Sequence, residues 1–520
     1  MKSFHLLPLL ALLSIIPLPA QAQSPSHSAP TVPALLLSDI HLDPFHDPAK
    51  FAALLAAPAT GWAVILDAPP SPTQAADFAH LQETCGARGV DTPPALLQST
   101  LHAARQQQPH PLLVTVSGDL MAHLFDCRFH AIAPSASAAE YSAFAAKTIA
   151  FVALQLRQTF PSTPIYFALG NNDSGCKDYS EDPGSDFLHA AAVSFSSDAV
   201  SPTNRSAILH QFPQLGDYTV TLPAPIRNTR LIVLQDIFES RRYATCNGTS
   251  NNDAAAQQTA WLRSQLTAAR AAHEHVWVMA HIPPGIDAYS TFTTHRDVCA
   301  GQPPVMFLAS DALATTLAEF PDVIRLALFA HTHMDEFRVY RSAAGARSAA
   351  GATTTPEGTI PVKLVPSIAP VNGNNPAFTL AEIDPSTATL KDYTVYRASN
   401  QAGGANTWDN KDTTWGEEYR FSTTYHLPDL SGASLEKLTT SFVDDKSGST
   451  DASRAYQQFF YVGDAGPAKS IKASMNAAAM QIVWPAYACA ITHADAASFR
   501  TCACPASPPP APGPLNPPNR

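Results

Sequence analysis

The sequence predicts an α/β fold, and two regularities support this prediction. Short apolar runs recur along the chain, and several are followed by a segment in which apolar residues have the spacing of an amphipathic helix. Several of the runs also end in a turn that carries Asp, Asn or His. Strands that alternate with helices form parallel sheets, and open α/β sheets place their ligands at the carboxyl ends of the strands. We therefore expect the polar turns to meet at one edge of the fold.

The expected elements follow in order along the chain. Strands are expected at residues 32–37, 112–116, 165–169, 231–234, 276–280 and 326–330. Helices are expected at residues 95–107, 140–159 and 254–272. Residues 62–94 are rich in Pro and Ala and have no clear period, so we expect loops there. Closing strands are expected at residues 362–365, 378–383 and 393–396.

Side chains of metal-ligand type lie directly after these strands. The clearest pair is His331 and His333, which follow the apolar run at residues 326–330. Because residues two apart in an extended segment point to the same side, both imidazoles can face one point. Asp39 and His41 repeat this arrangement after the first strand. The full set is Asp39, His41, Asp119, Asn171, His281, His331 and His333.

Each of these residues has a structural alternative when it is taken alone, since Asp after Gly is commonly a turn residue and Asn commonly caps a helix. Together they offer more ligands than the three or four that one tetrahedral zinc takes. They suit two divalent metal ions that share a bridging carboxylate. Such a pair supports in-line displacement at phosphorus, in which metal ions about 3.5–4 Å apart hold the attacking hydroxide. Mixed imidazole and carboxylate ligands favour zinc, with iron or manganese as alternatives.

The beginning of the chain has the features of an export signal. An apolar stretch at residues 6–18 precedes the small residues Ala20 and Ala22, which match a cleavage site. We expect a signal peptide over residues 1–22, a linker over residues 23–31, and a secreted or periplasmic mature protein. The apolar stretch is shorter than the roughly 20 residues of a membrane span, and no other long one follows. We therefore expect no transmembrane segment in the mature chain.

Composition agrees with an exported enzyme. The 520 residues are 45% hydrophobic, which is enough for one large domain and a smaller one. A net charge of -11 argues against a nucleic-acid partner held by bulk electrostatics, and we expect a monomer. The eight cysteines are even in number and lie outside the reducing cytosol if the chain is exported, so disulfides are expected rather than a metal cluster. We expect disulfides to fix the end of the chain through Cys489, Cys502 and Cys504.

The order of the polar motifs resembles the calcineurin-like metallophosphoesterases. Three longer stretches are similar to the acid sphingomyelinase-like phosphodiesterases within that superfamily. They are Gly-Asp-Leu-Met-Ala-His at residues 118–123, His-Ile-Pro-Pro-Gly at residues 281–285 and His-Thr-His-Met-Asp-Glu-Phe at residues 331–337. Weaker likenesses at residues 85–101 and 425–461 extend the resemblance to about residues 32–504.

This resemblance implies a two-sheet βαβ sandwich flanked by helices. It implies a catalytic domain over residues 32–400, a small and mostly helical C-terminal subdomain over residues 401–504, and a Pro-rich tail over residues 505–520. It also implies how the ligands are shared. Asp39, His41, Asp119 and His333 would hold one metal, and Asp119, Asn171, His281 and His331 the other, with Asp119 as the bridge.

Within the C-terminal region, residues 434–460 should be helical, with a polar interruption at residues 444–453. Trp408 and Trp415 have two interpretations. They can line a substrate cleft, or they can pack against the main domain, and we expect packing.

One position departs from the superfamily pattern. The residue after the Asn of the Gly-Asn motif is usually His, and here it is Asn172. An amide can hydrogen-bond an oxyanion but cannot donate a proton to a leaving group, so the general-acid role falls to His123. We expect activity to survive this change because lowering the pKa of water from 15.7 to about 7 corresponds to roughly 12 kcal/mol, whereas a general acid contributes about 10²–10⁴-fold. A branch of endopolyphosphatases also looks to carry Asn at this place.

A second departure concerns the substrate. Acid sphingomyelinase carries a saposin domain ahead of its catalytic domain, and there is no room for one between Ala22 and Asp39. We expect an exported phosphodiesterase that is sphingomyelin phosphodiesterase-like and acts on a lipid head group or a soluble phosphodiester. A nucleotide, polyphosphate or phosphomonoester hydrolase with the same site is the alternative. A non-catalytic exported metal-binding protein is a third hypothesis, although structural zinc sites are closed and this ligand set leaves open positions.

Overall fold

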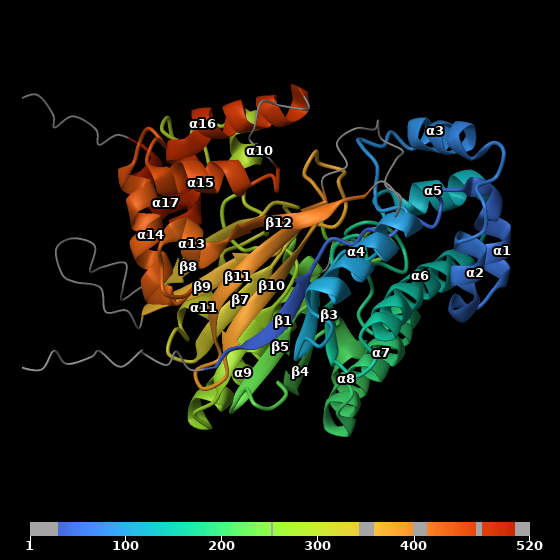
Figure 1. Cartoon of the computed structure of the whole chain (residues 1–520), viewed down its shortest axis with the longest axis horizontal. Coiled ribbons are helices and arrows are strands. Elements are labelled where there is room, and N and C mark those ends of the chain that lie inside the picture. The colour runs from blue at the N-terminus through green and yellow to red at the C-terminus, as the bar shows by residue number, and fades with distance from the viewer. Residues whose placement is uncertain (1–29, 251–252, 343–357, 399–412, 464–470, 505–520) are drawn as a thin grey trace, which may run out of the picture. The chain divides into compact units, whose positions relative to one another are not determined.

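The structure is a computed structural model that describes residues 30–250, 253–342, 358–398, 413–463 and 471–504. The expected signal peptide, the boundary near residue 400, Trp408 and the Pro-rich tail lie outside these residues. The described residues from Thr31 onward form one unit, in which two sheets are flanked by helices (Figure 1). The predicted α/β class and two-sheet architecture are confirmed.

The first sheet has six strands in the order β12-β11-β10-β1-β2-β3. Its strands are β1 (Val32–Leu37), β2 (Leu113–Ser117), β3 (Ile165–Ala168), β10 (Ala377–Asp384), β11 (Thr389–Ala398) and β12 (Trp415–Arg420). β1, β2 and β3 pair in parallel, with Leu35 opposite Val114 and Val116 opposite Phe167. Their carboxyl ends therefore lie together, and these are the ends that precede Asp39, Asp119 and Asn171.

The second sheet also has six strands, in the order β4-β5-β6-β7-β9-β8. Its strands are β4 (Tyr218–Thr221), β5 (Thr229–Val233), β6 (His275–Met279), β7 (Ile324–Phe329), β8 (Glu336–Arg341) and β9 (Thr359–Leu364). The middle four are parallel, and β4 and β8 are antiparallel edges. β8 was not expected because Glu336 and Arg338 read as surface charges, but they are buried and pair at 3.0 Å.

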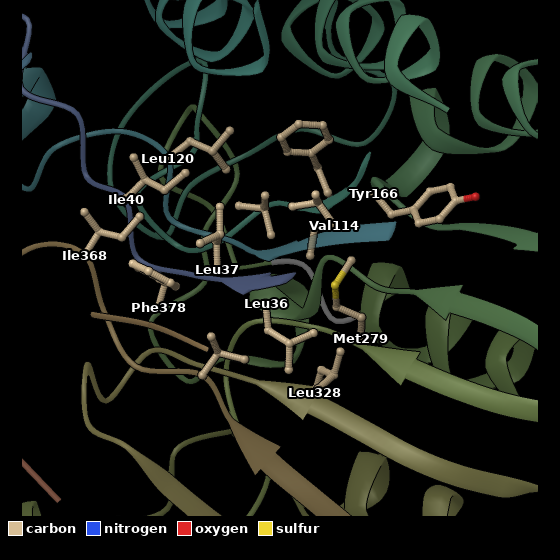
Figure 2. Packing of buried hydrophobic residues seen from close by; sticks show 14 of the residues in the cluster. Leu36, Leu37, Ile40, Val114, Leu120, Tyr166, Met279, Leu328, Ile368 and Phe378 are labelled. Atoms are coloured by element: carbon tan, nitrogen blue, oxygen red, sulfur yellow. The ribbon is translucent and has the colours of Figure 1, made fainter. Parts of the chain in front are cut away.

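The core lies between the two sheets. Leu36 and Val114 come from the first sheet and Met279 and Leu328 from the second, and Figure 2 shows these side chains facing one another. All four are fully buried. Parallel strands with both faces covered read as nearly continuous apolar runs, which is why the sequence identified these strands well. A rigid core of this kind fixes the loops that follow the strands.

Helices cover the sheets between consecutive strands. The three expected helices are confirmed as α4 (Pro94–Gln107), α6 (Ala138–Thr159) and α9 (Asp253–Ala271). Within the described residues, the other α-helices before the C-terminal region are α1 (Phe51–Ala56), α2 (Trp62–Leu66), α3 (Gln74–Thr84), α5 (Phe125–Ile132), α7 (Asp186–Asp198), α8 (Pro202–Leu215), α10 (Ala288–Thr293) and α11 (Ala312–Ala318). α6 begins with a capping box, in which the Ser137 hydroxyl accepts from the backbone N–H of Glu140 and the Glu140 carboxylate accepts from that of Ser137.

The expectation of loops over residues 62–94 was wrong. α2 and α3 form there, and the Trp62 side chain is buried with its indole N–H donating to the carbonyl of Leu54 at 3.0 Å. α3 buries only Phe78 and Leu81. With so few buried apolar residues in an Ala-rich segment, the sequence shows almost no helical periodicity of hydrophobic residues. Alanine itself nevertheless favours the helix.

The C-terminal region is mostly helical, as expected. Its helices are α13 (Phe421–Tyr425), α14 (Gly432–Asp444), α15 (Asp451–Phe459), α16 (Ile471–Thr492) and α17 (Ala496–Ala503). The Tyr487 hydroxyl donates to Oε2 of Glu336 at 2.8 Å, and the backbone N–H of Asp335 donates to the carbonyl of Phe460 at 3.0 Å. The C-terminal region therefore holds the segment that directly follows His333. The Trp415 indole donates to the Ser99 hydroxyl at 2.9 Å, so this tryptophan packs as expected.

The eight cysteines form four disulfides within the chain. They join Cys85 to Cys127, Cys176 to Cys246, Cys299 to Cys504 and Cys489 to Cys502. The expected disulfides, including those that fix the end of the chain, are confirmed, and their number fits an oxidising, non-cytosolic compartment. Among the helices of the described ranges, none is long and apolar enough to cross a membrane.

Candidate metal centre

The loops after five parallel strands bring the seven ligand-type residues to one place. Asp39 and His41 follow β1, Asp119 follows β2, Asn171 follows β3, His281 follows β6, and His331 and His333 follow β7. Backbone hydrogen bonds join the loops, such as those from Asp39 N–H to the Gly118 carbonyl and from His41 N–H to the Asp119 carbonyl. The site is therefore built from both sheets and lies at their shared edge.

Asp119 lies at the centre of this arrangement. Its Oδ2 is 3.0 Å from Nε2 of His281 and 3.5 Å from Nε2 of His41. One group of ligand atoms within 4.8 Å of one another comprises Asp119, His281 and His331, and another comprises Asp39, His41 and Asp119. Asp119 belongs to both groups. This is the arrangement that a carboxylate shared by two cations requires.

The surroundings of the Asp39 carboxylate indicate that the site can hold a cation. Both of its carboxylate oxygens are buried and have no hydrogen-bond partner in the described ranges, and the same holds for Oδ1 of Asn171. Its Oδ1 lies 3.5 Å from Nε2 of His333 and 3.8 Å from Nε2 of His41. A buried carboxylate without donors is costly unless it is paired with a cation or coordinates a metal. These oxygens, which lack hydrogen-bond partners, can coordinate divalent metal ions. Imidazole, carboxylate and amide oxygen are all donors that such ions accept.

Two of the histidines are oriented by backbone carbonyls. Nδ1 of His41 lies 2.8 Å from the Met121 carbonyl, and Nδ1 of His281 lies 2.8 Å from the Ser117 carbonyl. A carbonyl can only accept, so Nδ1 carries the proton in each ring. Nε2 is then the nitrogen that can donate its lone pair to a metal once it has lost its own proton, as in most histidine metal sites.

The backbone is strained at the ligands. Asp39, His41, Asp119, His331 and His333 have φ angles of 43°, 44°, 54°, 72° and 67°. Residues other than glycine rarely adopt this left-handed region, and such strain persists only where the surrounding structure fixes it. The turns also need glycine, because a Cβ on Gly118, which has a φ of 91°, would lie 2.7 Å from Nδ1 of His281. Close packing of the turns therefore determines where the ligands point.

Asp173 ties two of the turns together. Its Oδ1 accepts from the backbone N–H groups of Leu120 and Met121 at 2.8 and 2.9 Å, and its Oδ2 accepts from Gly170 N–H at 2.9 Å. The carboxylate therefore locks the turn that carries Asp119 against the turn that carries Asn171. The sequence contains Asp173 within the Gly-Asn-x-Asp motif, but its bracing role was not predicted.

His123, the predicted general acid, lies at the open side of the site. Its imidazole stacks on His41 with ring centroids 3.9 Å apart, and its side chain is 32% exposed. Nδ1 donates to Oδ1 of Asp91 at 2.7 Å, and Asp91 also accepts from Arg128 at 3.1 Å. Asp91 was missed as a site residue, since it lies in a turn that follows no strand. Because the Asp91 carboxylate holds Nδ1, Nε2 is the ring nitrogen that remains for other contacts.

Asn172, the second predicted catalytic residue, faces Asp119. Its side-chain amide donates to Oδ2 at 2.8 Å and its backbone N–H donates to Oδ1 at 2.9 Å. Asn172 is buried, whereas His123 is partly exposed. The amide therefore orients the central carboxylate in this structure.

The charges of the site divide its four histidines into two pairs. Burial opposes protonation of His41 and His281, but Asp119 and the other nearby carboxylates together outweigh it and raise the pKa of His41 to about 9 and that of His281 to about 10. Burial lowers the pKa of His331 to about 3, assisted by the charge of His281. Burial and His41 lower the pKa of His333 well below its usual range. Without metal, protons on His41 and His281 compensate the carboxylates.

These pKa values predict that metal binding releases protons. At pH 7 His41 and His281 carry protons that a cation must displace, so binding should release at least about two protons per chain. Affinity should rise with pH until about pH 10, because His41 and then His281 lose their protons over this range and less proton displacement is needed. Calorimetric titration of the metal-free protein with Zn²⁺, in buffers of different ionisation enthalpy, measures the proton count. An affinity that is unchanged between pH 6 and pH 9 would contradict this assignment.

Comparison with known proteins identifies the class to which this geometry belongs. Residues 32–335 match the calcineurin-like phosphoesterases, which is more than half of the chain. The chain belongs to the calcineurin-like phosphoesterase family and is an enzyme that hydrolyses phosphoric esters. Residues 357–506 match the acid sphingomyelin phosphodiesterase C-terminal region, so the predicted resemblance to the acid sphingomyelinase-like branch is confirmed. The family and the cluster of His and Asp imply two divalent metal ions.

The relatives cover most of the chain at modest identity. The chain is 26% identical over 416 residues to the human acid sphingomyelinase-like phosphodiesterase 3b, covering 79% of this chain and 80% of the relative. It is 25% identical over 355 residues to the human cyclic GMP-AMP phosphodiesterase SMPDL3A, covering 67% and 68%. Among solved structures, a dimetal phosphatase from Danio rerio aligns with a TM-score of 0.36 and 14% identity, covering 70% of this chain and 95% of that one.

Proposed function

We propose that this protein is an exported phosphodiesterase that uses two metal ions, held by the seven residues at the shared edge of the sheets. The observation that supports this most directly is the position of Asp119, which belongs to two groups of buried ligand atoms. The orphaned carboxylate of Asp39 supports it further. We assign Asp39, His41, Asp119 and His333 to one metal, and Asp119, Asn171, His281 and His331 to the other. Zinc is the metal that this imidazole-rich set favours.

When bound, two such cations activate water and withdraw charge from the phosphoryl oxygens. The residues of the chain supply the remaining steps. His123 donates a proton from Nε2 to the oxygen of the departing group, and Asp91 holds the opposite side of the ring at 2.7 Å. Asn172 keeps Asp119 in place through its amide and backbone N–H. Asp173 fixes the relative position of the turns that carry Asp119 and Asn171.

The names of the relatives and the open side of the site support the proposed substrate class. One relative is named an acid sphingomyelinase-like phosphodiesterase and another a cyclic GMP-AMP phosphodiesterase, and both names describe cleavage of phosphodiesters. We propose a phosphodiester substrate, with a lipid head group or a soluble diester as its source. We further propose that the chain is exported after removal of residues 1–22, that a catalytic domain and a helical subdomain meet near residue 400, and that the protein is a monomer.

A substrate panel tests the proposal. Sphingomyelin in mixed micelles, bis-nitrophenyl phosphate, a nucleoside triphosphate and polyphosphate are offered to the zinc-loaded protein, with a chelated sample as control. We expect the loaded protein to hydrolyse bis-nitrophenyl phosphate and at least one natural diester, and the chelated protein to be inactive. Exclusive turnover of triphosphate or polyphosphate would favour the alternative hydrolase. A loaded protein that cleaves none of the four would overturn the proposed function.

A further inference from the structure

An exposed cationic side chain lies one aromatic ring away from the metal centre. Arg242 is 66% exposed, and its guanidinium carbon lies 3.9 Å from the centre of the Tyr179 ring. The Tyr179 hydroxyl lies 3.4 Å from Nε2 of His331. A single aromatic ring therefore separates this guanidinium from a residue of the metal centre.

The loop that carries Arg242 is fixed to the site by several bonds. The disulfide between Cys176 and Cys246 joins this loop to the one that follows Asn171. The backbone N–H of Ala244 donates to the Tyr179 carbonyl at 3.1 Å, and the N–H of Tyr179 donates to the Asn171 carbonyl at 2.9 Å. These bonds connect Arg242 to a ligand-type residue through one short stretch of chain. The guanidinium is therefore held in place beside the centre rather than displayed on a separate loop.

Asp178 offsets part of this positive charge. Its Oδ2 accepts from Nη2 of Arg242 at 3.0 Å, and its Oδ1 accepts from the Asn171 amide at 2.8 Å. A guanidinium has five N–H donors, and this contact uses one terminal nitrogen. The exposed side of the group can still bind an anion, with an affinity that the neighbouring carboxylate moderates.

We infer that Arg242, stacked on Tyr179, forms a subsite for a second anionic group of the substrate, next to the phosphate that is cleaved. The inference rests on the proposed function and narrows its substrate class to phosphoesters that carry another phosphate or carboxylate close by. A cationic head group such as choline suits this subsite poorly. The guanidinium repels it, and the Tyr179 ring, which is 6% exposed, already has Arg242 on its face.

Binding of two simple probes tests the subsite without turnover. Calorimetry measures the Kd of orthophosphate, with one phosphoryl group, and of methylenediphosphonate, with two, on the zinc-loaded wild type and on Arg242→Ala. The metal content of each sample is measured after the titration. Since exposed charge pairs are weak, Arg242→Ala should weaken methylenediphosphonate about fivefold more than it weakens orthophosphate. The difference should shrink in 0.5 M salt.

Arg241→Ala is the matched control, because Arg241 is the exposed neighbour on the same loop and carries the same charge. It should leave the ratio of the two Kd values unchanged. An equal effect of both substitutions would assign the preference to bulk charge and overturn the subsite, as would an unchanged ratio in Arg242→Ala. A wild type that binds the two probes equally would overturn it too. Failure of the proposed function would appear separately, as absence of turnover in the substrate panel.

Discussion

Asp119→Asn is expected to lose both metal ions and to slow phosphodiester hydrolysis by at least about 10⁴-fold, because metal activation of water corresponds to roughly 12 kcal/mol. An amide is neutral and binds cations more weakly than a carboxylate. It also removes the charge that lies 3.0 Å from His281 and 3.5 Å from His41. Elemental analysis of the purified variant, together with turnover of bis-nitrophenyl phosphate, measures both effects.

Asp198→Asn is the matched control for this variant. Asp198 is a buried carboxylate in α7 that accepts from Arg157 at 2.8 Å, and it lies outside the site. The same chemical change there should lower stability while metal content and turnover stay at wild-type values. Wild-type turnover in a metal-free Asp119→Asn sample would show that the seven residues do not form the reaction centre.

His123→Ala is expected to slow esters with alkoxide leaving groups by about 10²–10⁴-fold, and nitrophenyl esters by much less. An alkoxide needs a proton as it departs, whereas a nitrophenolate is stable without one. Asp91→Asn should give a smaller loss of the same kind, because Asp91 orients His123 at 2.7 Å without touching the substrate. Rates on a matched pair of diesters that differ only in the leaving group measure the contrast.

Metal content separates the general-acid role from metal binding. His123 lies within 4.8 Å of the ligand atoms of His41 and His333, so its position alone would also suit a ligand. If it is the general acid, His123→Ala retains two metal ions. Equal losses on both kinds of ester, or loss of a metal ion, would remove His123 from the acid role.

The sequence indicated the ligands well because each follows a buried parallel strand. The apolar runs before Asp119 and His331 are covered on both faces, and the carboxyl ends of such strands lie at a common edge. Ligands that are far apart in the chain therefore lie close together in space. The fold class and the strand positions were predictable for the same reason.

Other features depend on contacts between distant segments and left no local signal. Asp91 contacts His123 from a turn that follows no strand. Arg242 stacks on Tyr179, and the disulfide that joins their loops pairs two cysteines that spacing alone cannot match. Asn172 was predicted as a catalytic residue, but its contact with Asp119 was not foreseen. The helices at residues 62–94 were missed because only a few of their side chains are buried.

The most direct measurement of the central claim is anomalous diffraction at the zinc absorption edge from crystals of the zinc-loaded protein. Two peaks are expected about 3.5–4 Å apart. Asp119 should lie between them, with Asp39, His41 and His333 on one side and Asn171, His281 and His331 on the other. A single peak, or peaks away from Asp119, would contradict a centre that two cations share.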